Sequence, residues 1–273
     1  MTEAPLIEAK AVTKRFPGRR AFPWQKAPVL EAVKNVSVSV QPGVSLGIVG
    51  ESGCGKSTLA RMLVGLTKAS AGTIDIDGHR VWAGDRAVNR QARQRIQMVF
   101  QDPLGSLNPR KTVRQLIEAP LIGLTGMTAA ERRGRVEALM DLVGLRPEFI
   151  HRHAHEFSGG QCQRIGIARA LATEADILIL DEPVSALDVS IQAQILKLLA
   201  DLRQRLGLTY LFISHDLSVV NHVCDQVAVM YFGEVVETGP TGSVLRNPAH
   251  DYTRRLLAAV PGDRLEALRA GQT

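Results

Sequence analysis

The sequence of 273 residues has few aromatic side chains, which make up 4% of it. Grooves that bind single-stranded nucleic acid offer several aromatic rings on which bases stack. Basic residues gather between positions 80 and 95 and between 110 and 114, and Trp82 is the only aromatic residue near them before Phe100. The net charge of +6 therefore indicates a solvated basic face that attracts an anionic ligand or membrane surface, rather than a nucleic-acid site.

The sequence also lacks a hydrophobic run of the roughly 20 residues that cross a bilayer. Residues 1–5 lack the basic region and apolar run of a signal peptide, so we expect the chain to stay in the cytosol. The three cysteines, Cys54, Cys162 and Cys224, form no metal-binding pattern and are expected to be free thiols. A helix N-terminus could lower the pKa of Cys54, but a packed, inert thiol is the favoured interpretation.

Residues 50–57, Gly-Glu-Ser-Gly-Cys-Gly-Lys-Ser, form a complete G-x-x-x-x-G-K-[ST] motif. The apolar run 44–49 predicts a buried strand before it, and apolar residues recur at helical spacing after it, at Leu59, Met62, Leu63 and Leu66. A strand, a glycine loop and a helix are the context in which this motif binds phosphates. Lys56 would reach the β- and γ-phosphates, and the Ser57 hydroxyl would bind Mg²⁺. The sequence therefore predicts a site for a nucleoside triphosphate.

An acidic pair, Asp181 and Glu182, follows the short apolar run 177–180. The run is too short for a core helix and predicts a buried strand. Beside a phosphate loop, Asp181 would hold Mg²⁺ through its water shell and Glu182 would polarise the attacking water. An acidic pair after a strand is also common as a helix N-cap. The phosphate loop favours the catalytic interpretation.

A second glycine turn, Ser158-Gly159-Gly160-Gln161, precedes apolar residues at helical spacing, Ile165, Ala168 and Leu171. The pattern predicts a helix start whose N–H groups form a second anion site, about a hundred residues after the first. For Ser-Gly-Gly alone, a capped helix without a ligand is the alternative.

Together these motifs resemble those of the ATP-binding cassette (ABC) ATPases over nearly the whole chain. Residues 50–57 resemble the Walker A motif of that family, residues 177–182 its Walker B motif, and residues 157–161 its LSGGQ signature with Phe in place of Leu. Three further matches follow in the family's order: the Q-loop glutamine at Gln101, the D-loop at residues 185–188 and the switch histidine at His215.

The resemblance implies an α/β fold with a phosphate-loop (RecA-like) core, an antiparallel β-subdomain and an inserted α-helical subdomain. Residues 1–102 and 161–240 would form the core with the β-subdomain, residues 103–160 the helical insertion and residues 241–273 a C-terminal tail. The pattern of the residues predicts further strands at 36–40, 73–76, 96–100, 208–214, 227–230 and 234–237, helical stretches around 113–117 and 136–143, and a surface loop at 17–28.

The resemblance also implies a mechanism in which two cassettes pair head to tail. Each ATP would lie between residues 50–58 of one subunit and residues 158–161 of the other. Glu182 would be the general base, His215 would hold the γ-phosphate, and Gln101 would join Ser57 and Asp181 at Mg²⁺. The residues expected to bind the nucleotide are Phe16, Gly50, Glu51, Ser52, Gly53, Cys54, Gly55, Lys56, Ser57, Thr58, Ser158, Gly159, Gly160, Gln161 and Asp188. Phe16 would stack on adenine, with a buried core Phe as the alternative.

The expected partners are a second ATPase subunit, identical or paralogous, and two transmembrane permease subunits that the helical insertion would contact. An extracytoplasmic binding protein would be reached only indirectly. The expected location is peripheral, at the cytoplasmic face of the membrane, and no nucleic-acid partner is expected.

The extended Q-loop at 101–110 and the tail at 247–257 resemble the peptide importer ATPases, although Asp251 stands where that subgroup usually has Pro. A di- or oligopeptide cargo is therefore expected, with nickel or an opine-like molecule as the alternative. Two other classes are a mechanical ATPase acting on DNA or ribosomes and a regulatory module without turnover. The chain lacks the long coiled-coil insertion or second cassette of the first class, and Glu182 with His215 disfavours the second.

Overall fold

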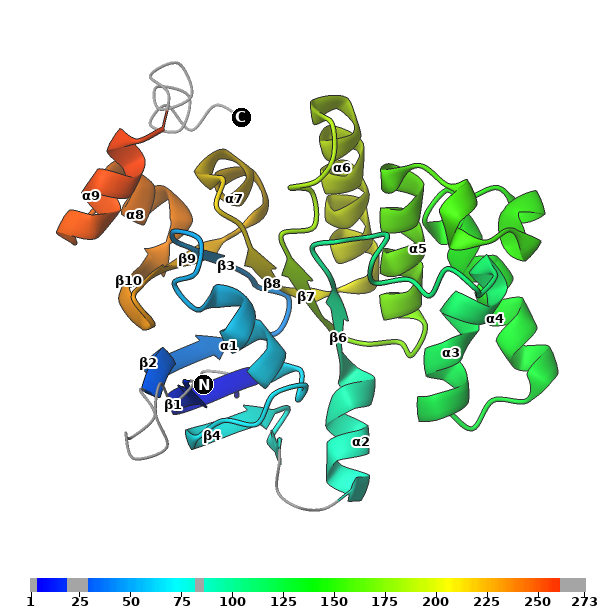
Figure 1. The fold of residues 1–273 in the computed structure, drawn as a ribbon, viewed down its shortest axis with the longest axis horizontal. Coiled ribbons are helices and arrows are strands. Elements are labelled where there is room, and N and C mark those ends of the chain that lie inside the picture. Colours follow the sequence, from blue (N-terminus) through cyan, green and yellow to red (C-terminus); the bar gives the residue numbers. More distant parts are fainter. Residues whose placement is uncertain (1–3, 19–28, 82–85, 261–273) are drawn as a thin grey trace. The chain divides into compact units, whose positions relative to one another are not determined.

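The computed structural model describes residues 4–18, 29–81 and 86–260 (Figure 1). They form two compact units: unit 1 contains the chain up to Asn89 and from Phe212 onward, and unit 2 runs from Arg90 to Leu211. One boundary falls within helix α2 (Arg86–Arg95) and the other within strand β8 (Thr209–Ile213). The expected subdomain boundaries remain a prediction. Trp82 and residues 19–28 of the expected surface loop lie outside the described residues.

Unit 1 contains a four-stranded antiparallel sheet of order β2-β1-β4-β5. The strands are β1 (Ile7–Pro17), β2 (Val29–Val40), β4 (Ala71–Ile76) and β5 (His79–Arg80). In β2 the side chains from Val36 to Val40 alternate between buried and exposed, which confirms the predicted strand there. The predicted hairpin turn is also confirmed, because Asp77 and Gly78 both have positive φ, 48° and 75°, as a tight two-residue turn requires.

A second group of strands in unit 1 contains β3 (Ser45–Val49), β9 (Gln226–Tyr231) and β10 (Glu234–Pro240). β9 runs parallel to β3 and antiparallel to β10, so the two predicted strands near the C-terminal end pair as expected. All five residues of β3 are buried, as the apolar run predicts. The helices of this unit are α1 (Lys56–Leu63), α7 (Leu217–Val223), α8 (Thr241–Arg246) and α9 (Asp251–Ala258).

The prediction that Leu66 belongs to the helix after the phosphate loop is wrong. Helix α1 ends at Leu63, and Gly65 has a φ of 74°. The N–H groups of Gly65 and Leu66 donate back to the carbonyls of Met62 and Arg61, which closes the last turn. Leu66 is 57% exposed, so the apolar periodicity extends one residue beyond the glycine that follows the end of the helix.

Unit 2 contains the parallel pair β6 (Ile96–Val99) and β7 (Ile177–Asp181), with Ile96 opposite Ile177. Its helices are α3 (Val113–Leu124), α4 (Ala129–Leu142), α5 (Gly159–Leu171) and α6 (Val189–Leu206), with two short 3₁₀ turns, η1 (Pro147–His151) and η2 (Ala154–Glu156). α3 packs on both α4 and α5 (Figure 1). The two predicted helical stretches are confirmed and begin at capping boxes on Thr112 and Thr128.

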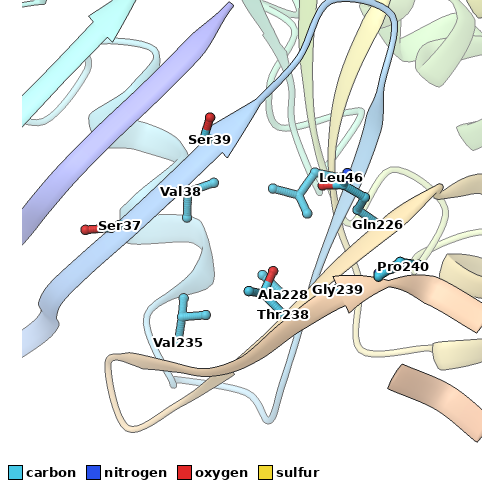
Figure 2. A pocket seen from close by; sticks show the side chains of 10 residues that line it. All are labelled: Ser37, Val38, Ser39, Leu46, Gln226, Ala228, Val235, Thr238, Gly239 and Pro240. Atoms are coloured by element: carbon cyan, nitrogen blue, oxygen red, sulfur yellow. The ribbon is translucent and has the colours of Figure 1, made fainter. Parts of the chain in front are cut away.

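No helix among the described parts of the chain combines the length and apolarity of a membrane span. Unit 1 has a cavity of about 300 Å³ between β2, β3, β9 and β10 (Figure 2). Small side chains such as Ser37, Val38 and Thr238 line it, together with Gln226, and none of its lining residues carries a charge. An uncharged cavity does not suit a triphosphate, and it contains none of the predicted site residues.

Candidate functional site

The phosphate loop joins β3 to α1 in unit 1 and depends on glycine at three positions. Gly50, Gly53 and Gly55 have φ angles of 151°, 79° and 110°, which residues with a Cβ rarely adopt. A Cβ on Gly50 would lie 2.1 Å from the Met230 carbonyl oxygen, and one on Gly55 would lie 2.1 Å from that of Ala32. The glycines therefore allow both the turn of the loop and the close approach of its neighbours.

Lys56 begins α1 and folds back over the loop. Its side chain is buried, and its ammonium donates hydrogen bonds of 2.8 Å to the carbonyls of Gly50 and Glu51. Gly55 is the N-cap and, among the described residues, no side chain caps the helix. Backbone N–H groups in the first turn, where Ser57 and Thr58 lie, thus face the loop with the positive end of the helix dipole.

Cys54 is a packed thiol, as the favoured interpretation predicted. Its side chain is buried, and this burial raises the pKa of the thiol, although the Lys56 charge 3.8 Å away opposes the shift. A raised pKa keeps the group protonated and unreactive. Cys162 and Cys224 are also buried thiols that are not joined in a disulfide.

Neighbouring elements hold the loop from outside. The Gly233 N–H, in the turn between β9 and β10, donates to the Cys54 carbonyl at 3.0 Å. The Glu51 N–H donates to the hydroxyl of Tyr252 on α9, also at 3.0 Å. The sequence motifs gave no signal for Tyr252, because it lies 201 residues beyond Glu51.

In unit 2 the acidic pair stands at the end of β7. Asp181 is buried as the last residue of the strand, and Glu182 adopts a left-handed φ of 46°. The Gln101 side-chain amide donates to a Glu182 carboxylate oxygen at 2.9 Å, so the expected Q-loop glutamine and general base lie together. The following helix, α6, begins only at Val189, which excludes the alternative that the pair is a helix N-cap.

The predicted signature turn opens α5 in unit 2. Ser158 is its N-cap and forms a capping box with Gln161, and the preceding Phe157 is buried against Phe149 with ring centroids 5.4 Å apart. A Cβ on Gly160 would lie 2.5 Å from the Ile191 side chain of α6, so glycine allows these helices to approach. Ser158 and Gly159 themselves are exposed and accessible to a ligand.

The remaining predicted residues lie apart from these groups in the chain. Phe16 on β1 is 39% exposed, with the Lys14 ammonium 5.0 Å from its ring centroid, so the alternative of a buried core Phe is wrong. His215 follows β8 in unit 1 and is exposed. Asp188 is the exposed N-cap of α6 in unit 2. Their assembly around one nucleotide remains a prediction.

The residues present fit a magnesium nucleotide. Ser57 in unit 1 and Asp181 and Gln101 in unit 2 each carry a side-chain oxygen, the type of ligand atom that Mg²⁺ prefers. A Cβ at Gly50 or Gly55 would clash with neighbouring backbone, so the loop keeps its turn only with glycine there, and the Lys56 ammonium lies against its carbonyls.

A family model described as ABC transporter matches residues 33–185. The chain belongs to the ABC transporter family. The dipeptide transport ATP-binding protein DppF of Haemophilus influenzae is 47% identical to this ABC chain over 257 residues, covering 94% of it and 78% of the relative. The oligopeptide transport ATP-binding protein OppF of Escherichia coli is 52% identical over 251 residues, covering 89% and 73%.

Solved structures of ABC cassettes share the fold. The ATP-binding cassette MJ0796, in a dimeric post-hydrolysis state bound to ADP and Pi, matches with a TM-score of 0.75 and 30% identity over 86% of this chain and 98% of its own. CbiO1 of Clostridium perfringens, part of the transporter complex cbiONQ, matches with a TM-score of 0.75 and 27% identity over 96% and 98%. The expected fold class, a RecA-like α/β core with β- and helical subdomains, is confirmed.

Proposed function

We propose that this chain binds and hydrolyses ATP as the energising subunit of an ABC importer for di- or oligopeptides. The observation that carries the proposal is the glycine-dependent phosphate loop, in which the buried Lys56 ammonium is held ready at the Gly50 and Glu51 carbonyls. The Gln101–Glu182 hydrogen bond supports turnover rather than binding alone, because it orients a carboxylate that can accept a proton from water.

In the proposed mechanism the N–H groups of residues 50–58 hold the phosphate oxygens, except that of Glu51, which donates to Tyr252. Phe16 stacks on the adenine. Lys56 exchanges its two carbonyl partners for the β- and γ-phosphates. Ser57, Asp181 and Gln101 would hold Mg²⁺, which would supply positive charge beside the phosphates when bound. Glu182 accepts the proton of the water that attacks the γ-phosphorus, and the bond from that atom to the β–γ bridging oxygen breaks.

The site is completed by a second ATPase subunit in this proposal. Ser158–Gly159–Gly160–Gln161 and Asp188 of one subunit would meet the nucleotide on the phosphate loop of the other, head to tail. The exposure of Ser158 and Gly159 at the start of α5 leaves them available for such a contact. The dimeric state of MJ0796 supports the pairing by analogy. His215 would hold the γ-phosphate of the nucleotide that is bound to the phosphate loop of its own subunit.

The assembly would include two transmembrane permeases, contacted by the helical insertion at the cytoplasmic face of the membrane, and a binding protein reached indirectly. The relatives named for dipeptide and oligopeptide transport favour a peptide cargo over nickel or an opine-like molecule. Peptide import driven by ATP hydrolysis is therefore the function that the site and the comparisons support best.

The cargo is tested by deleting the gene and measuring uptake of labelled dipeptides, labelled oligopeptides and nickel. We expect peptide uptake to fall and to return with the wild-type gene but not with Glu182→Gln, whereas nickel uptake stays unchanged. Asp201→Asn, which changes an exposed acid on α6 outside the helical insertion, is the matched control and should restore uptake. Lost nickel accumulation with normal peptide uptake would overturn the peptide assignment and leave the ATPase proposal standing.

A further inference from the structure

The C-terminal element, residues 247–258, is fixed to unit 1 through the β10 carboxylate of Glu237. The N–H groups of Ala249 and His250 donate to the two oxygens of this carboxylate at 2.8 and 3.0 Å. His250 then caps α9, because its Nδ1 accepts the Tyr252 N–H at 3.1 Å. In Figure 1 the chain continues from β10 through α8 into α9. The start of α9 is thus tied to β10 by two hydrogen bonds.

This docking buries Tyr252 beside the phosphate loop. Only 2% of Tyr252 is exposed, and its ring stacks on Tyr231 with centroids 4.0 Å apart and an interplanar angle of 29°. Its hydroxyl oxygen accepts the Glu51 N–H at 3.0 Å. Burial raises the pKa of the Tyr252 hydroxyl, which therefore stays neutral. A residue of the C-terminal element thus contacts the backbone of the loop directly.

The contact falls on the peptide group between Gly50 and Glu51, which loses its other hydrogen bond when a nucleotide binds. Lys56 donates to the Gly50 carbonyl of this group, and that bond must break when the ammonium turns to the phosphates. The hydrogen bond from the Glu51 N–H to Tyr252 does not depend on Lys56 and remains. It also satisfies a backbone donor that is costly to leave unpaired next to a buried ring.

We propose that Tyr252 is a positioning residue that holds the start of the phosphate loop in the conformation that accepts phosphates, so that the C-terminal element sets nucleotide affinity. The inference rests on the proposed nucleotide site, and it adds a residue outside the sequence motifs that determines nucleotide affinity. Tyr252 acts through the peptide group between Gly50 and Glu51 and does not contact the reacting atoms.

Tyr252→Phe removes the hydroxyl and keeps the ring, and Tyr231→Phe is its matched control. Among the described residues the Tyr231 hydroxyl has no hydrogen-bond partner, although its ring belongs to the same stack. Losing the bond to a partly buried N–H should weaken ATP binding by about 5- to 20-fold in Tyr252→Phe. Tyr231→Phe should bind within about twofold of wild type. Affinity is measured on the full chain with EDTA present, by competition of ATP against a fluorescent nucleotide.

A second readout separates positioning from a loss of stability. We expect the Glu51 amide to exchange hydrogen faster in Tyr252→Phe than in Tyr231→Phe, while the thermal midpoints of the two nucleotide-free variants stay close. Unchanged ATP affinity in a folded Tyr252→Phe variant would overturn the inference. A wild-type chain that binds no ATP would instead overturn the proposed function, so the two failures are distinguishable.

If Tyr252→Phe does not fold, Glu237→Gln tests the same inference by weakening the docking of the C-terminal element while the hydroxyl stays in place. The matched control is Glu234→Gln, an exposed acid on the same strand. Glu237→Gln should lower ATP affinity by about 3-fold or more and speed Glu51 amide exchange, and Glu234→Gln should do neither. Equal affinity in the two variants would contradict the proposal.

Discussion

Replacing Glu182 by Gln isolates the proposed general base. The substitution keeps the size of the side chain, and an amide oxygen can accept the hydrogen bond that Gln101 now donates to the carboxylate at 2.9 Å. The position of the side chain at the end of β7 should therefore be preserved. What is lost is a group that can take a proton from water.

The expected loss of turnover follows because Glu182→Gln removes the proton acceptor and keeps the hydrogen bond. A positioned general base accelerates proton transfer by about 10²- to 10⁴-fold, so turnover should fall by at least about 10²-fold. This corresponds to a rise of about 2.7 kcal/mol or more in the activation free energy. ATP affinity should change little, because the groups proposed to bind the phosphates are on the phosphate loop in unit 1 and not on Glu182.

The assay measures steady-state phosphate release and ATP affinity on the same preparation, with the exposed Glu137→Gln on α4 as control. Glu137→Gln should match wild type in both quantities. Wild-type turnover in Glu182→Gln would refute the assignment of the base. An equal loss of affinity and turnover would refute the reasoning that the substitution leaves the phosphate loop untouched.

Three other substitutions test the site and its surroundings. Gly55→Ala places a Cβ 2.1 Å from the Ala32 carbonyl at a φ of 110° and should lower the free energy of unfolding by about 2–5 kcal/mol in urea titrations. In Gly134→Ala, on α4, the added Cβ meets no atom within 4 Å, so this control should raise the free energy of unfolding slightly. Equal changes in the two variants would contradict the steric argument. Ser158→Arg should abolish hydrolysis and leave the ATP affinity of a verified monomer unchanged, whereas lost affinity in the monomer would show that the turn contacts its own nucleotide. Burial opposes the ionisation of Glu237, but hydrogen bonds and the His250 charge outweigh it and lower its pKa. Its contribution to stability is therefore present above the unfolded pKa of about 4.3 and is lost as pH falls through the lower folded pKa. Glu237→Gln should reduce the loss of stability below about pH 4.3 in acid titrations, and an unaltered acid profile would contradict this origin.

The sequence predicted those parts of the site that are continuous in the chain. Residues 50–57 carry their own turn geometry, because glycine at 50, 53 and 55 is what the positive φ angles require. The contact between Gln101 and Glu182 spans 81 residues, and only the resemblance to a family placed both in one site. Tyr252 was missed because a lone tyrosine in a helix carries no motif, and its contact with Glu51 arises only in the folded chain.

Local irregularities explain the errors and omissions in the fold. Strand β1 went unpredicted because Ala11 has a left-handed φ of 52° and the pairing with β2 shifts register around it, which breaks the alternation. Helix α2 is dominated by arginine and offers little apolar periodicity. Leu66 continued the apolar pattern of α1, but periodicity does not register the stop at Gly65.

The measurement that tests the central claim most directly is phosphate release by this chain assembled with the proposed permeases, with and without peptide-loaded binding protein. The proposal predicts ATP hydrolysis that rises when the peptide-loaded protein is added and that disappears with Glu182→Gln in the same assembly. A rate that is indifferent to peptide, or that survives Glu182→Gln, would contradict an ATPase that drives peptide import through this site.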